Sequence, residues 1–110
     1  MFAITGIALR PVWYNYCVPF NGVVIRAFNM RNGLTDECVT PKLTGRNGTF
    51  VLVQPDWSNG QAVRVGDVIR VSVTDPLNRL RRPLRCFPSE YTVEPWQVSQ
   101  LNLRLNVLVY

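Results

Sequence analysis

The sequence predicts an all-β fold, a single antiparallel β-sandwich of about seven strands. The dipeptide Asn-Gly occurs four times, at intervals of 11 to 15 residues, at positions 21–22, 32–33, 47–48 and 59–60. Asn and Gly accept the positive φ angles of tight hairpin turns, and this spacing is typical of a sandwich. Eight prolines are scattered along the chain, and no capped apolar stripe of helical period is present, so we expect almost no helix.

Short apolar segments between these turns predict the strands. In chain order they are Phe2–Leu9, Val23–Asn29, Thr49–Gln54, Asp67–Thr74 and Val98–Val109. In the fourth segment Ile69, Val71 and Val73 alternate with polar residues, which indicates one buried and one solvated face. The third segment is apolar on both faces between Thr49 and Val53. We therefore expect that strand to be central in its sheet or covered by another element.

The last segment, residues 98–109, has the most regular alternation. One face carries only Leu and Val, namely Leu101, Leu103, Leu105, Val107 and Val109. Such a strand either closes the sheet of its own chain or completes the sheet of a neighbouring subunit by strand exchange. The first strand, or the aromatic segment after it, is an alternative donor. Strand exchange would make the protein a subunit of a filament or shell.

The length and composition indicate one domain, spanning residues 1–110 and complete from the first residue to the terminal strand. Apolar residues make up 47% and charged residues 17% of the chain, which is typical of a folded protein. No run approaches the roughly 18 apolar residues of a membrane-spanning helix, and Met1–Arg10 shows no export signal.

The order of strands and turns resembles a known family of modules. Ile4-Thr5-Gly6, Val23 to Ala27, Gly45 to Leu52 and Val65 to Val71 together resemble the carboxypeptidase regulatory-like and transthyretin-like modules. The resemblance implies an immunoglobulin-like sandwich and a non-catalytic accessory, adhesive or structural role. The segment from Trp13 to Phe20 departs from the pattern because it is longer and more aromatic.

The residues that usually carry catalysis or bind metals are sparse. The chain has no histidine, the usual general base and the commonest metal ligand. Cys17, Cys38 and Cys86 are too far apart in sequence for a zinc or redox motif. We expect buried thiols, no metal, no cofactor and no enzymatic activity.

Basic residues dominate the charge. The net charge is +5, and eleven of the twelve basic residues are arginines, with Lys42 the exception. Four of them, Arg79, Arg81, Arg82 and Arg85, lie in one predicted loop. They are candidates for contact with an anion or an acidic partner, and the alternative is a solvated loop. No aromatic platform is interleaved with them, so nucleic acid is not an expected partner.

Aromatic residues outside the predicted strands form the candidate interaction surface. They are Trp13, Tyr14, Tyr16, Trp57 and Trp96. Exposed rings of this kind bind proteins or glycans, and the alternative is that they plug the open ends of the sandwich. Two functions therefore stay open. The first is a structural subunit that self-associates or decorates a larger assembly, such as an extracellular surface filament or a virion, and the second is a monomeric module that binds carbohydrate or protein.

Overall fold

The computed structural model describes residues 1–54 and 63–110, and β-strands make up most of its regular structure. The described residues form ten strands rather than about seven, with one short helix. In chain order the elements are β1 Phe2–Trp13, β2 Tyr16–Pro19, β3 Val24–Asn29, β4 Thr35–Val39, β5 Thr49–Gln54, β6 Val68–Thr74, β7 Cys86–Phe87, β8 Glu90–Thr92, α1 Pro95–Gln100, β9 Asn102–Arg104 and β10 Val107–Val109.

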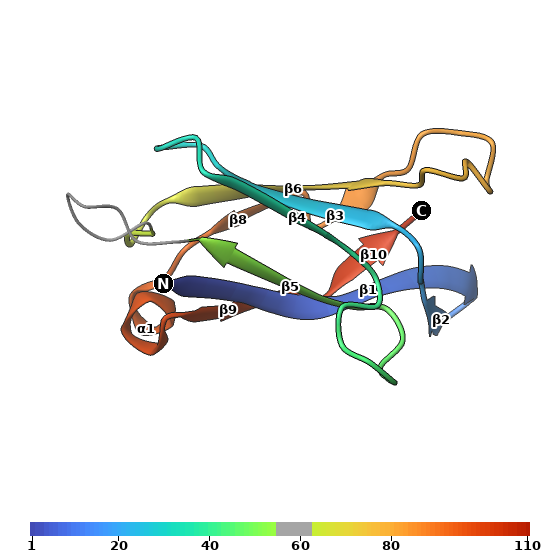
Figure 1. The fold of residues 1–110 in the computed structure, drawn as a ribbon, viewed down its shortest axis with the longest axis horizontal. Helices are drawn as coiled ribbons and strands as arrows, with labels where there is room; N and C mark the ends of the chain where they lie inside the picture. Colours follow the sequence, from blue (N-terminus) through green and yellow to red (C-terminus); the bar gives the residue numbers. More distant parts are fainter. Residues whose placement is uncertain (55–62) are drawn as a thin grey trace.

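Two sheets face each other (Figure 1). The four-stranded sheet is antiparallel in the order β4-β3-β6-β8. The six-stranded sheet is built around β1, which pairs antiparallel with β5 and β2 and parallel with β9 and β10. Strand β7 joins this sheet beyond β10. The prediction of a wholly antiparallel sandwich is therefore wrong for this sheet, because the first strand and the last two run in the same direction.

Strand β5 has the predicted bounds but is not central in its sheet. Among the described strands it pairs only with β1, at an edge of its sheet. Its outer edge faces β4 of the other sheet, where the Asp36 carboxylate accepts a hydrogen bond of 2.6 Å from the backbone N–H of Val53. The side-chain amide of Gln54 donates to the backbone carbonyl of Leu34 at 3.3 Å. Hydrogen bonds between the two sheets, made by the side chains of Asp36 and Gln54, thus take the place of a neighbouring strand at this edge.

The terminal segment is the clearest correction to the predicted fold. Residues 98–109 do not form one strand, since α1 begins at Pro95 with a reciprocal capping box between Glu94 and Gln97. Leu101 ends the helix in the left-handed conformation, with φ of 56°, and is 48% exposed. Strands β9 and β10 follow, and the predicted alternation is kept through them and the link between them, since the inward side chains are buried in the core of their own chain: Leu103, Leu105, Val107 and Val109.

The Asn-Gly pairs occupy turns of two kinds. Gly22, Gly33 and Gly48 all have positive φ, as the turn interpretation requires. Of the three pairs that the structure describes, the pair at 32–33 alone closes a hairpin, between β3 and β4. The pairs at 21–22 and 47–48 lie where the chain crosses from one sheet to the other, and the pair at 59–60 lies outside the described residues.

The core lies between the two sheets. Its largest fully buried apolar side chains come from β1, β3, β5, β6 and β9: Phe2, Ile4, Ile25, Phe50, Leu52, Ile69 and Leu103. Each of these side chains occupies an inward position in a two-residue alternation, as a pleated strand dictates. Within the described part of the chain, no helix is long and apolar enough to cross a membrane.

Candidate functional site

The most prominent surface feature is a two-stranded hairpin that continues past the sandwich. Strand β1 pairs with β10 only at Ala8 and Leu9, and beyond Leu9 its paired residues Arg10, Pro11 and Trp13 have partners in β2 alone among the described strands. In Figure 1 this hairpin projects at the opposite end of the molecule from α1. We call residues 11–18 the aromatic hairpin. A ribbon of two strands has little stability alone, so this end depends on its attachment to the sheet or on a partner.

The rings of the aromatic hairpin are open to solvent. Trp13 is 72% exposed, Tyr14 92% and Tyr16 62%. The rings of Trp13 and Tyr14 meet edge to face, with centroids 6.0 Å apart and planes at 85°. These three side chains therefore do not plug the end of the sandwich, and that alternative is wrong for them.

Phe20, which the sequence did not single out, fills the end of the sandwich instead. It is 6% exposed and belongs to the core. The guanidinium carbons of Arg79 and Arg10 lie 4.7 Å and 5.8 Å from its ring centroid. Such cation–π contacts fix the ring at the base of the aromatic hairpin.

The other two predicted aromatic residues do not join this surface. Trp96 lies in α1 and is 53% exposed, and its indole N–H donates to the Glu94 carboxylate at 2.5 Å. Because α1 and the aromatic hairpin lie at opposite ends of the molecule (Figure 1), Trp96 and Trp13 form separate surfaces. Trp57 lies outside the described residues.

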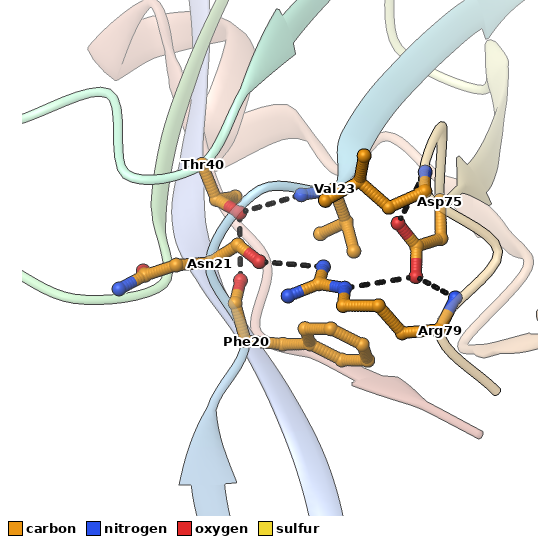
Figure 2. A network of polar contacts seen from close by, with 7 residues as sticks. Phe20, Asn21, Val23, Thr40, Asp75 and Arg79 are labelled. Atoms are coloured by element: carbon orange, nitrogen blue, oxygen red, sulfur yellow. Dashed lines mark hydrogen bonds and ion pairs between the residues drawn. The ribbon is translucent and has the colours of Figure 1, made fainter.

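Arg79 differs from the other arginines of its loop because it is held by the protein itself (Figure 2). Its backbone N–H and its Nε both donate to one carboxylate oxygen of Asp75, each at 3.0 Å, and its Nη2 donates to the backbone carbonyl of Asn21 at 2.8 Å. Burial alone raises the pKa of Asp75, but the hydrogen bonds from Arg79 and from the backbone of Leu77 outweigh it, and the pKa lies below its usual value. Arg79 thus fastens the loop to the chain beside Phe20.

We expect Asp75→Asn to loosen this loop without unfolding the protein, because the neutral amide holds the Arg79 guanidinium less tightly. Trypsin should then cut after Arg79 and Arg81 at least several-fold faster than in the wild type, as followed by mass spectrometry. Glu90→Gln is the matched control, since it removes an equal charge from an exposed ion pair with Arg70. Equal cleavage rates in the two variants would show that Asp75 does not anchor the loop.

The remaining arginines of the loop are exposed and have no side-chain partner among the described residues. Arg81 and Arg82 line an open pocket of about 480 Å³ together with Thr74, Pro83 and Leu84. Arg85 is exposed, and its backbone exchanges hydrogen bonds with that of Tyr110, which extends the pairing of β7 with β10. Three of the four predicted anion-contacting side chains are therefore accessible, and Arg79 is the one already engaged.

The thiols and carboxylates have structural environments. Burial raises the pKa of the Cys38 and Cys86 thiols, and the Cys86 thiol donates to the Val71 carbonyl at 3.1 Å. Cys17, like these two, is a free cysteine. The described carboxylates each accept hydrogen bonds within the protein: Asp36, Glu37, Asp67, Asp75, Glu90 and Glu94. Among the described residues, no three His, Cys, Asp or Glu side chains are grouped closely enough to hold a metal ion.

A groove that the sequence did not predict crosses the outer face of the six-stranded sheet. It has a volume of about 450 Å³ and is lined by residues of β1, β5, β9 and the loop before β5, including Arg46 and Arg104. The polar, outward position of Arg104 in the terminal alternation is the one sequence signal that points to it.

Comparison of the chain with protein-family models, with curated proteins and with solved structures finds no match. The resemblance to carboxypeptidase regulatory-like and transthyretin-like modules therefore stays a prediction. The candidate sites are argued from their own geometry.

Proposed function

We propose that this protein is a non-enzymatic structural subunit that self-associates through the aromatic hairpin, as part of a larger assembly such as an extracellular surface filament or a virion. The observation that carries the proposal is the exposure of Trp13, Tyr14 and Tyr16 together on a ribbon that extends past the sandwich. Large exposed apolar groups gathered at one place mark interaction sites on soluble proteins. The proposal includes an immunoglobulin-like or transthyretin-like sandwich, modules that serve adhesive or structural roles.

The aromatic hairpin is suited to contact a second copy because it is uncharged. Residues 11–20 include no Asp, Glu, Lys or Arg, although the chain as a whole carries a net charge of +5. Two copies that meet through this hairpin bring rings together, and residues 11–20 add no charged side chain to the contact. A contact of this kind is isologous, so the same patch serves both copies and gives a dimer, which is the proposed building unit of the larger assembly.

The area of the rings is sufficient for a large part of an interface. A Trp or Tyr side chain buries roughly 150–250 Å² when it is covered, so three largely exposed rings supply on the order of 450 Å² per copy. A stable interface takes about 800 Å² from each partner. The outer edge of β2 can supply the remaining interface area, because β2 pairs with β1 alone among the described strands. Its unpaired main-chain groups can form hydrogen bonds with the second copy.

The rival function, a monomeric carbohydrate-binding module, is less well supported by the ring geometry. The planes of Trp13 and Tyr14 are nearly perpendicular. They do not form one flat platform on which a sugar ring would stack. Perpendicular rings are suited to insertion between the side chains of a protein partner. A monomeric protein-binding module remains the alternative that the same surface would serve.

Absence of a catalytic role is supported by the state of the reactive groups. The pKa of two thiols is raised, so they stay protonated at neutral pH and are poor nucleophiles. The described carboxylates are engaged by N–H donors or arginines rather than grouped in a cleft. These groups stabilise the fold and are not arranged for acid–base chemistry.

The test is the mass in solution of the wild type and of the triple variant Trp13→Ala, Tyr14→Ala, Tyr16→Ala, measured by light scattering across a concentration series. The wild type is expected to exceed the monomer mass of 12.6 kDa, and the triple variant is expected to remain monomeric. Loss of three ring contacts at an interface weakens association by at least 100-fold.

The matched control removes three exposed apolar side chains elsewhere, in the variant Leu77→Ala, Phe87→Ala, Trp96→Ala. Their exposures of 74%, 64% and 53% are comparable to those of the hairpin rings. The control is expected to associate like the wild type. A monomeric wild type at all concentrations would refute self-association, and equal weakening of the two triple variants would refute the assignment to the aromatic hairpin.

A further inference from the structure

We infer that the groove on the outer face of the six-stranded sheet binds an acidic peptide segment of another protein, in which carboxylates flank an apolar residue. This site is separate from the aromatic hairpin. It does not depend on self-association of the protein. Its residues come from three strands and one loop that are distant in sequence.

The floor of the groove is a row of side chains across the sheet. Val51 and Arg104 are both register partners of Thr5, on its two sides. Neighbouring strands are about 4.8 Å apart, so Val51 and Arg104 are separated by about 10 Å across the floor. Ile7 and Leu43 also line the groove, and Leu43 is 43% exposed. The floor is therefore aliphatic at one side and cationic at the other.

The loop that forms one wall is already ordered. The Thr49 hydroxyl donates to the backbone carbonyl of Arg46 at 2.7 Å and accepts from the backbone N–H of Leu43 at 3.1 Å. Asn21 donates to the Asn47 side chain at 3.1 Å and accepts from the backbone N–H of Gly48 at 2.6 Å. These bonds hold the wall in place before any ligand arrives, which lowers the entropic cost of binding.

Two arginine side chains of the groove have no partner in the described part of the chain. Neither the Arg46 nor the Arg104 side chain forms a hydrogen bond or ion pair within residues 1–54 and 63–110, whereas Arg26, Arg31, Arg70 and Arg79 are all paired with carboxylates. Both arginines are exposed, so a ligand that brings carboxylates can pair with the two guanidinium groups.

The chemistry of the groove favours a peptide over other anions. No exposed aromatic ring lines it, since Phe50 is 1% exposed beneath the floor. Nucleic-acid bases and sugar rings are bound largely by stacking on such rings, so the groove lacks their main source of affinity. Aliphatic side chains accept the apolar residue of a peptide, and the arginines bind its carboxylates. A second copy of this chain is disfavoured because of its own positive charge.

The test uses two blocked five-residue peptides, Asp-Glu-Leu-Glu-Asp and its neutral counterpart Asn-Gln-Leu-Gln-Asn, titrated into the whole protein. Binding is followed by NMR shifts of the methyl groups of Ile7, Leu43 and Val51. The acidic peptide is expected to shift these signals saturably and the neutral peptide is not. The double variant Arg46→Gln, Arg104→Gln is expected to lower the affinity about tenfold or more.

The matched control is Arg82→Gln, Arg85→Gln, which removes the same charge from the arginine loop. It should keep the affinity within about twofold of the wild type, because only long-range attraction is lost. The triple variant of the aromatic hairpin should also bind the acidic peptide normally, so this test and the self-association test fail independently. Equal losses in the two arginine variants, or equal binding of the two peptides, would overturn the proposal. So would saturable shifts of the same methyl groups by a heparin hexasaccharide or an oligonucleotide but not by the acidic peptide.

Discussion

Replacing Gly6 by alanine is expected to destabilise the protein strongly. Gly6 lies in β1, where a Cβ atom would fall 1.9 Å from the carbonyl oxygen of Leu105 and 2.8 Å from Cζ of Phe50. The carbonyl oxygen of Leu105 belongs to the backbone that links β9 to β10. The N–H of the same residue donates a hydrogen bond of 2.8 Å to the Thr5 carbonyl. The added methyl group must therefore push the two parallel strands away from β1.

The expected loss of unfolding free energy for Gly6→Ala is about 3 kcal/mol or more. For a chain of this size that corresponds to a fall in Tm of about 10 °C or more, measured by circular dichroism. Gly33→Ala is the control, since nothing lies within 4 Å of its added Cβ and only its φ of 75° opposes the change. That strain costs about 1–2 kcal/mol. If Gly6→Ala is no more destabilising than Gly33→Ala, the close approach of β1 and Leu105 is wrong.

A second large loss of stability is expected for Asp67→Asn. The Asp67 side chain is 4% exposed and accepts hydrogen bonds from Arg31 at 2.7 Å, from Asn29 at 2.9 Å and from the backbone N–H of Arg64 at 2.9 Å. An amide in this place would present its own N–H groups to these donors. Breaking a buried pair in this way costs about 3 kcal/mol at neutral pH, measured by urea denaturation.

The same carboxylate predicts an acid-dependent loss of stability. Burial raises the pKa of Asp67, but the hydrogen bonds from Arg31, Asn29 and Arg64 together outweigh it, and the pKa lies below its usual value. The unfolded chain therefore takes up this proton at a higher pH than the folded chain. The stabilisation is complete above about pH 5 and is lost as the pH falls through about 3.9 toward the lower folded value. In Asp67→Asn this part of the acid dependence should be missing.

Glu37→Gln is the control for Asp67→Asn. The Glu37 side chain forms an ion pair of 2.9 Å with Arg26, but the two are 52% and 57% exposed. Exposed ion pairs contribute about 0–1 kcal/mol. A loss at Asp67 no greater than the loss at Glu37 would show that the buried network does not stabilise the fold.

Local patterns in the sequence were sufficient to predict the strands that bury one face. The bounds of β5 match the prediction at both ends, because a positive-φ glycine precedes it and the apolar run stops at Gln54. Strand β4 was missed because it carries Asp36 and Glu37 and buries none of its side chains fully. Its place is set by backbone pairing with β3 and by contacts of Asp36 with the facing sheet, neither of which leaves a hydrophobic signature.

The terminal segment shows where alternation misleads. Leu101 fits the two-residue pattern of the strand residues that follow it, yet it ends a helix. The signals of that helix were present in the sequence, since Pro95 follows a capping glutamate and Gln97 completes the capping box. The strand alternation outweighed these signals, because a helix of six residues is too short to show an apolar stripe of helical period.

The candidate sites were only partly predictable for a related reason. Aromatic residues between Trp13 and Phe20 indicated an interaction surface, but which ring is buried depends on Arg79, distant in sequence, and its contact with Phe20. Likewise, the sequence showed a cluster of four arginines, but it did not show that Arg79 forms an ion pair with Asp75. The groove joins β1, β5, β9 and a loop, so only the register of the sheet brings its residues together.

The central position of β1 has a consequence for the order in which the protein can fold. Thr5 is a register partner of Arg104, and Ala8 is one of Val107, so this strand needs neighbours that lie 99 residues later in the sequence. The chain must lose the conformational entropy of closing a loop of that length before the strand pairing can stabilise it. This makes folding slow. During synthesis, β1 is therefore left with one side unpaired until β9 and β10 have emerged, and in this period the nascent protein is exposed to aggregation and to chaperones.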